Sequence, residues 1–150
     1  MTDQIIITKP NLGKRITAGF IDYGIIFLLF FVLIYFFGVH TEDKGYTLTG
    51  LPAIGLMLFW FLYTIGAEQL FGATLGNYLE NLEVISILDN QPSLTFGQSF
   101  KRHLLDLIDI WLFGVLAILF IKNTKYNQRL GDIWARTIVV DTMDQSQGFQ

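Results

Sequence analysis

Two long apolar stretches dominate the pattern of hydrophobic and polar positions along the chain. The first, residues 16–38, has 23 residues, and Asp22 is its only charged residue. The second, residues 52–71, has 20 residues, and Glu68 is its only charged residue. An α-helix rises about 1.5 Å per residue, so about 20 residues are enough to cross a hydrocarbon core about 30 Å thick. The pattern therefore predicts two membrane-spanning helices, the first of which extends over about residues 13–39.

A third apolar stretch, residues 104–121, is ambiguous. Asp106 and Asp109 interrupt its first half, and the 12 residues that follow, 110–121, carry no charge. Twelve helical residues cover about 18 Å, which is too short to cross a membrane alone. Either the two aspartates face protein and the whole stretch crosses, or residues 98–112 lie along the membrane surface and the rest dips in and returns.

The distribution of basic residues favours the second alternative. Basic residues before the first span predict a cytoplasmic N-terminus, with the acidic loop at residues 40–50 outside. A third crossing would carry four basic residues of the C-terminal part to the outside, against the same rule. We therefore expect two full spans and a third short, re-entrant or interfacial helix. The basic residues are Lys9, Lys14 and Arg15 before the first span, and Lys122, Lys125, Arg129 and Arg136 in the C-terminal part.

Two short segments rich in β-branched residues predict a small ribbon outside the lipid. Residues 82–88 are followed by the turn sequence Asp-Asn-Gln-Pro, and residues 137–140 are Thr-Ile-Val-Val. Their pairing requires both to lie on one side of the membrane, which the charge distribution makes cytoplasmic. The expected fold is thus an all-α membrane protein with a two-stranded β-ribbon. Its parts are an N-terminal arm (1–12), a membrane domain (13–141) and a polar C-terminal tail (142–150).

Composition agrees with membrane residence and narrows the chemistry. Apolar residues make up 52% of the chain, and its mean hydropathy is +0.47. The net charge of −3 argues against nucleic acid as a partner, because phosphates are bound by basic faces. The chain has no cysteine, which excludes disulfides and thiolate metal sites. The lipid bilayer is the partner that the composition predicts, and no cofactor is expected.

Asp22 is costly inside a membrane-spanning segment unless it faces protein or water and has a partner. Arg15 lies seven residues earlier, two helical turns away, and so shares a face of the helix with it. In one interpretation Asp22 makes a polar contact that holds helices together. In the other it binds a cation or carries a proton, and Arg15 modulates it. The segment Gly72–Gly76 that follows the second span matches no phosphate-binding loop and is predicted to be loop punctuation.

His103, Asp106 and Asp109 recur every three residues and form a polar stripe on a predicted helix. One interpretation is the solvated face of an interfacial helix, with Arg102 pairing with Asp106 four residues on. The other is a cation site, although such stripes are common and we expect no metal centre here. Neither histidine has a serine or cysteine at a suggestive spacing, so no catalytic residue is identified.

Asp132 precedes the second β-rich segment. It is expected to cap a helix that starts at Ile133, or to pair with Arg129 or Arg136. Together with the features above, its surroundings resemble the RDD family of small bacterial membrane proteins, which is named for one arginine and two aspartates. The match covers residues 11–141 and rests on Arg15–Asp22, Thr74–Gly76, Val84–Leu88, Arg102, Arg129–Asp132 and Thr137–Val140. By this match the three name-giving residues are Arg15, Asp22 and Asp132.

The resemblance implies a bacterial plasma membrane protein and, by analogy with some members, exchange of monovalent cations for protons. In that hypothesis Asp22 titrates, Arg15 modulates it, and Asp132 is a cytoplasmic gate or a partner of Arg15. Two or three spans make a poor pore alone, so transport predicts a homo-oligomer. The alternative is a non-enzymatic accessory or scaffold subunit bound to a partner membrane protein. A third, less favoured class is a membrane enzyme that uses Asp106 and Asp109 with a divalent metal.

This chain departs from the family pattern after the second span. The usual Gly-Lys-Arg is Gly76-Asn77-Tyr78 here, and Glu80 and Glu83 follow where basic residues are usual. The change weakens any interpretation in which this loop grips anionic lipid headgroups.

Overall fold

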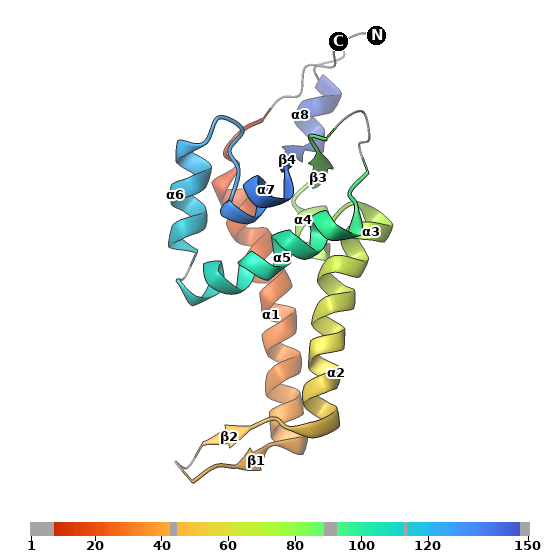
Figure 1. Cartoon of the computed structure of the whole chain (residues 1–150), viewed down its shortest axis with the longest axis vertical. Coiled ribbons are helices and arrows are strands. Elements are labelled where there is room, and N and C mark those ends of the chain that lie inside the picture. The colour runs from red at the N-terminus through yellow and green to blue at the C-terminus, as the bar shows by residue number, and fades with distance from the viewer. Residues whose placement is uncertain (1–7, 43–44, 89–92, 113, 148–150) are drawn as a thin grey trace.

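Two long helices stand side by side in the computed structural model, which describes residues 8–42, 45–88, 93–112 and 114–147 (Figure 1). The first is α1 (Leu12–Phe37). The second is continuous from α2 (Gly50–Phe61) through a π-helical turn, η1 (Leu62–Gly66), into α3 (Ala67–Phe71). Both are long and apolar enough to cross a membrane, and only 6% and 11% of their apolar windows are buried. The prediction of two candidate spans is confirmed.

A short ribbon joins the two long helices at one end of the molecule (Figure 1). It consists of β1 (Val39–His40) and β2 (Tyr46–Thr47), which pair antiparallel with Val39 opposite Thr47. The sequence predicted only a polar loop here, because two-residue strands leave no detectable alternation of side chains. The α1 helix also ends at Phe37, two residues before the predicted boundary.

The remaining elements form a head around the other end of the two helices (Figure 1). Its ribbon is β3 (Leu82–Ser86) paired antiparallel with β4 (Thr137–Asp141), so the predicted pairing is confirmed. All five residues of β4 are buried, and Leu82, Val84 and Val139 pack with Ala18 of α1 in a small core. Short helices complete the head: α4 (Leu75–Leu79), α7 (Leu130–Ala135) and α8 (Thr142–Gln147).

The third apolar stretch folds as two helices that turn back on themselves. Helix α5 (Phe96–Trp111) passes crosswise over the two long helices, and α6 (Val115–Asn123) then runs back toward the level of the β3–β4 ribbon (Figure 1). The turn is made at Gly114, whose φ of 72° is readily adopted by glycine. Within the described ranges, α1 and the α2–α3 helix are the candidate spans, which agrees with the expected third short segment.

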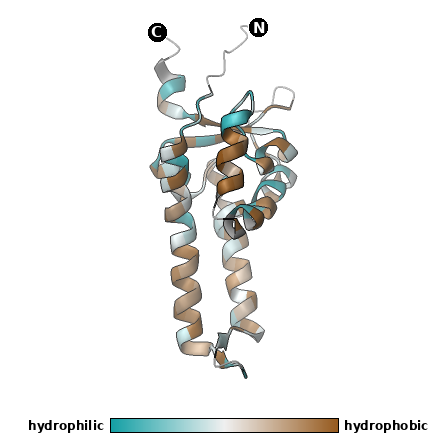
Figure 2. Ribbon diagram, turned by 90° about the vertical axis from the view of Figure 1, so that its left-hand side faces the viewer, coloured by the Kyte–Doolittle hydropathy of each residue, from teal (hydrophilic) through white to brown (hydrophobic). Residues whose placement is uncertain are grey.

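Helix α5 buries its polar face and exposes its apolar face. Arg102, His103, Asp106 and Asp109 are all buried. The apolar side chains of the opposite face are exposed by 38–53%; they are Phe96, Phe100, Leu104 and Ile108. The interpretation of the polar stripe as a solvated face is therefore wrong. Brown, hydrophobic colour covers the two long helices, whereas the head mixes both colours (Figure 2).

Candidate functional site

Asp22 lies where α1, η1 and α4 meet, and three donors occupy its carboxylate. The Tyr63 hydroxyl donates to Oδ1 at 2.9 Å, the Thr74 hydroxyl to Oδ2 at 2.7 Å, and the Gly76 backbone N–H to Oδ1 at 2.7 Å. A Cβ at Gly76 would lie 2.8 Å from the Asp22 Cγ and even closer to the Ala18 carbonyl oxygen. Only glycine allows α4 to come this close to α1. The carboxylate thus ties three elements together through neutral donors.

The segment Gly72–Gly76 is more than loop punctuation. Thr74 is the N-cap of α4 and accepts a hydrogen bond from the Asn77 N–H at 3.4 Å while its hydroxyl donates to Asp22. Tyr63 belongs to the π-helical turn, a feature that often occurs at functional positions. The sequence pattern did not identify Tyr63 and Thr74 as donors, because they lie 41 and 52 residues from Asp22 along the chain.

Asp132 is the centre of a second, ionic cluster. It is fully buried, and its Oδ1 accepts from Arg102 Nε at 2.9 Å. Its Oδ2 accepts from the Arg129 backbone N–H at 2.9 Å and lies 3.5 Å from Arg15 NH1. Burial raises the pKa of Asp132, but Arg102, Arg129 and Arg15 outweigh it and hold the pKa below its usual range. Asp132 therefore stays ionised among three arginines.

Two predictions for Asp132 need correction, and one agrees with the contacts. The helix starts at Leu130, not at Ile133, and Arg129 is its N-cap. Asp132 caps this helix from its third position by accepting the Arg129 N–H, as in a capping box. The Arg129 side chain also reaches Asp132, with Nε 3.8 Å from Oδ2. Arg136 is exposed at the C-cap of α7, and in the described part of the chain it forms no ion pair with Asp132.

Arg15 does not pair with Asp22, although the two share a helix. Its guanidinium instead faces Asp132 and donates to the Val139 carbonyl of β4 at 3.4 Å. Arg15 and Asp132 are 117 positions apart in the sequence, so this contact connects the first candidate span to the C-terminal part of the head. One of the roles suggested for Asp132, that of a partner for Arg15, agrees with this geometry.

Arg102 pairs with Glu68 and Asp132, not with Asp106 as the helical spacing predicted. Its NH1 donates to Glu68 Oε1 at 2.8 Å, and both side chains are buried. Glu68 lies in α3, at the end of the second candidate span, and sequence reasoning assigned it no role. The sequence could have marked Glu68 as a site residue, because it is the only charged residue of that apolar stretch and such a charge needs a partner.

His103 bridges two carboxylates. Its Nε2 lies 3.2 Å from Glu68 Oε1, and its Nδ1 lies 2.8 Å from Asp106 Oδ2. Burial lowers the pKa of His103, but the charge of Glu68, the hydrogen bond with Asp106 and the charge of Asp106 raise it to about 9. The imidazole is therefore protonated at neutral pH, and it links α3 to α5.

Asp106 has partners on three elements. Besides His103, it accepts from Arg129 NH1 at 2.9 Å and from the Tyr23 hydroxyl of α1 at 3.1 Å. Burial raises the pKa of Asp106, but Arg129 and His103 keep it well below its usual range. Arg129 thus spans Asp106 and Asp132 and joins the two halves of the cluster.

Asp109 completes the cluster and differs from its neighbours. Burial raises its pKa, and its Oδ2 is buried without a hydrogen-bond partner in the described part of the chain. Three arginines (15, 102 and 129) face three paired carboxylates (Glu68, Asp106 and Asp132). Protonated His103 adds one positive charge, which ionised Asp109 would balance. Among the described residues, no group of three His, Cys, Asp or Glu side chains is placed to hold a metal ion.

Fold and site together define a helical, membrane-type protein with two candidate spans and a head built around a buried ionic cluster. A family model, the RDD family, matches residues 9–136, and the chain belongs to this family. Comparisons with curated proteins and with solved structures found no match. The three residues assigned to the family name, Arg15, Asp22 and Asp132, all lie in buried polar contacts, and Arg15 and Asp132 meet directly.

Proposed function

We propose that the protein resides in a bacterial plasma membrane and exchanges a monovalent cation for protons. The observation that carries this proposal is His103, buried between the carboxylates of Glu68 and Asp106 at the end of the two candidate spans. Buried ionisable groups at membrane-spanning helices are expensive to keep, and they commonly mark ion pathways or proton relays.

The proton carrier in this proposal is His103 rather than Asp22. Both oxygens of Asp22 already accept hydrogen bonds from neutral donors, which leaves little room for a cation. When His103 releases its proton, Glu68 and Asp106 lose a positive neighbour and the cluster gains one unit of negative charge. A monovalent cation can then replace the proton, and Asp109 Oδ2, which has no hydrogen-bond partner among the described residues, is an available oxygen ligand. A single site that binds either the proton or the monovalent cation, but not both, exchanges one for the other.

Transport in this proposal requires a homo-oligomer. Both long helices expose apolar side chains on most sides, and two helices alone do not enclose a path. Gly19, Gly24 and Gly55 face open space, so they would let a neighbouring helix approach closely. Basic residues at the head favour a cytoplasmic head and termini, with the β1–β2 ribbon outside.

The test uses purified protein in liposomes, with internal pH followed after addition of sodium, potassium or lithium. Wild type should move protons in response to at least one cation. His103→Gln should lower that rate at least about tenfold, as loss of a proton-transferring group typically does. His40→Gln, which changes the exposed histidine at the ribbon, is the matched control and should keep the rate. Equal rates for wild type and His103→Gln would refute the assignment of the proton site.

The second candidate function is a non-enzymatic accessory or scaffold subunit. The saturated Asp22 contact favours it, because this geometry is suited to holding helices together for docking. Absence of flux in a folded wild type, under either membrane polarity, together with co-purification of a defined membrane partner would support it. Strictly monomeric protein without a partner in mild detergent would argue against both candidates.

A further inference from the structure

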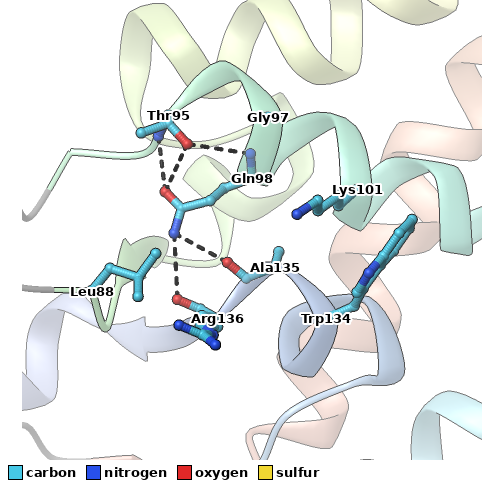
Figure 3. A pocket seen from close by; sticks show the side chains of 8 residues that line it. All are labelled: Leu88, Thr95, Gly97, Gln98, Lys101, Trp134, Ala135 and Arg136. Atoms are coloured by element: carbon cyan, nitrogen blue, oxygen red, sulfur yellow. Dashed lines mark hydrogen bonds between the residues drawn. The ribbon is translucent and has the colours of Figure 1, made fainter.

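A pocket of about 370 Å³ lies on the head, and none of its lining residues belongs to the ionic cluster. The first turns of α5, the end of α7 and the end of β3 surround it (Figure 3). Its lining combines two cations with apolar and aromatic side chains; those used below are Leu88, Gln98, Lys101, Trp134 and Arg136.

Gln98 builds the floor of the pocket. It is 5% exposed, and its Nε2 donates to the Ser86 hydroxyl at 2.8 Å and to the Ala135 carbonyl at 3.1 Å. Its Oε1 accepts from the Thr95 N–H at 3.0 Å (Figure 3). One side chain thus fixes α5, α7 and β3 relative to one another, so the pocket is a preformed feature of the fold.

Two positive charges lie at this pocket without acidic partners. Among the described residues, neither Lys101 nor Arg136 forms an ion pair, whereas Arg15, Arg102 and Arg129 are all paired. The Lys101 ammonium lies 5.7 Å from the centre of the Trp134 ring (Figure 3). Both basic side chains are exposed. Two unpaired cations beside one preformed pocket favour a ligand with negative charge.

Apolar surface continues from the pocket along α5. Gly97, Lys101 and Leu104 follow at spacings of four and three residues, so the pocket and the exposed apolar face share one side of the helix. Phe96 and Phe100 stack with their centroids 6.3 Å apart beside it. The ligand that fits both parts has an anionic head and an apolar body.

The pocket lies level with the end of the second candidate span. A hydrocarbon core about 30 Å thick takes up about 20 helical residues, and 20 residues counted from Gly50 end at Gln69. The Gln69 amide donates to the Ser99 hydroxyl at 3.0 Å, and Ser99 follows Gln98. The pocket therefore sits where the apolar core gives way to headgroups, a level at which tryptophan and lysine are enriched.

We propose that this pocket binds the phosphate-bearing headgroup of an anionic glycerophospholipid. Lys101 and Arg136 contact the phosphate, Trp134 packs against the glycerol region, and the acyl chains lie along the apolar face of α5. The site requires only that the head faces the bilayer, so it stands or falls independently of cation exchange.

The test measures lipid retained by the full-length protein with native mass spectrometry in detergent, using phosphatidylglycerol and, separately, phosphatidylcholine. Wild type should retain phosphatidylglycerol preferentially. Lys101→Gln combined with Arg136→Gln should weaken this retention about 10- to 30-fold, since each basic residue near an anionic surface contributes a comparable share. The matched control, Lys122→Gln with Lys125→Gln, removes two other exposed lysines and should change retention less than about twofold.

Three outcomes would overturn the proposal. Equal loss in the pocket variant and the control would mean diffuse attraction of anionic lipid to basic surface. Full competition by millimolar inorganic phosphate would mean a site for the free anion. Retention of phosphatidylcholine equal to that of phosphatidylglycerol would remove the role of the two cations. The swap Lys101→Arg with Arg136→Lys keeps the charge and should retain the lipid, which separates loss of charge from loss of folding.

Discussion

Asp22 and Asp132 are both buried aspartates, but the fold holds them by different means. Hydroxyl and backbone N–H groups surround Asp22, whereas three arginines surround Asp132. Loss of a carboxylate charge among neutral donors leaves hydrogen bonds unmade. Loss of the charge at Asp132 also leaves several buried cations with too little compensation.

We expect Asp132→Asn to destabilise the protein more than Asp22→Asn does. The cost should be about 3–5 kcal/mol at Asp132, the usual penalty for breaking a buried ion pair, and about 1–3 kcal/mol at Asp22. Thermal unfolding of both variants in one detergent measures the difference. Thr17→Ala, an exposed change on α1, is the control and should be nearly silent. A reversed order would mean that the arginines find other partners.

His103 gives the head a dependence on alkaline pH. Its pKa is about 9 in the folded state and near 6.5 when unfolded, so its contribution is complete below about pH 6.5 and is lost as pH rises through 9. We expect the melting temperature of wild type to fall by roughly 5 °C between pH 6.5 and 9.5. In His103→Gln this part of the fall should be missing. An identical pH profile for the two proteins would contradict the assignment.

Most residues of the site could be chosen from sequence, although Glu68, Tyr63 and Thr74 were missed, but their pairing could not. Arg15, Asp22, Arg102, Asp106, Asp109 and Asp132 were all singled out, and the structure buries them. Local spacing predicted the pair Arg102–Asp106, whereas Arg102 instead meets Glu68, 34 residues away. A periodicity argument sees only neighbours on one helix, and it cannot rank partners that other elements bring.

At the scale of elements, α5 shows why amphipathicity alone does not fix orientation. A helix with one polar and one apolar face lies in a soluble protein with the polar face outward. Here Arg102, His103 and Asp106 turn inward because charged groups of α3 and α7 pair with them and a hydroxyl of α1 donates to Asp106. The polar and the apolar face of α5 were predicted correctly from the sequence, but the elements that pack against the helix decide which of the two is buried.

The close approach of α4 to α1 depends on Gly76. In Gly76→Ala the new methyl group would overlap the Ala18 carbonyl, push the helices apart and weaken the hydrogen bond from residue 76 to Asp22. We expect a loss of about 2–4 kcal/mol, measured by thermal unfolding, in the range of overpacking plus one lost buried hydrogen bond. Gly13→Ala, where a Cβ meets nothing within 4 Å, is the control and should be neutral or slightly stabilising.

At the scale of the whole molecule, the fold separates a polar head from an apolar hairpin. Length and hydropathy predicted the two spans, and β-branched residues beside a turn sequence predicted the β3–β4 ribbon, because each is a local signal. The π-helical turn and the β1–β2 ribbon were not predicted, because each depends on backbone geometry that the side-chain pattern does not encode. A third segment that returns was expected, but its turn was not placed at Gly114. The head and the β1–β2 ribbon lie at opposite ends of the two long helices (Figure 1).

This arrangement makes the membrane topology testable, because the chain has no cysteine of its own. Single cysteines at Thr41, Ser93 and Lys125 report the ribbon, the start of α5 and the segment between α6 and α7. With a cytoplasmic head, a membrane-impermeant maleimide should label Thr41→Cys in intact cells, and Ser93→Cys and Lys125→Cys only after permeabilisation. Lys125 decides the third segment: labelling from the same side as Thr41 would mean that α5 and α6 together cross the membrane. Labelling from the side of Ser93 would fit a segment that enters the membrane and returns to the same side. We expect this result, because a third crossing would carry four basic residues to the outside, against the positive-inside rule; they are Lys122, Lys125, Arg129 and Arg136.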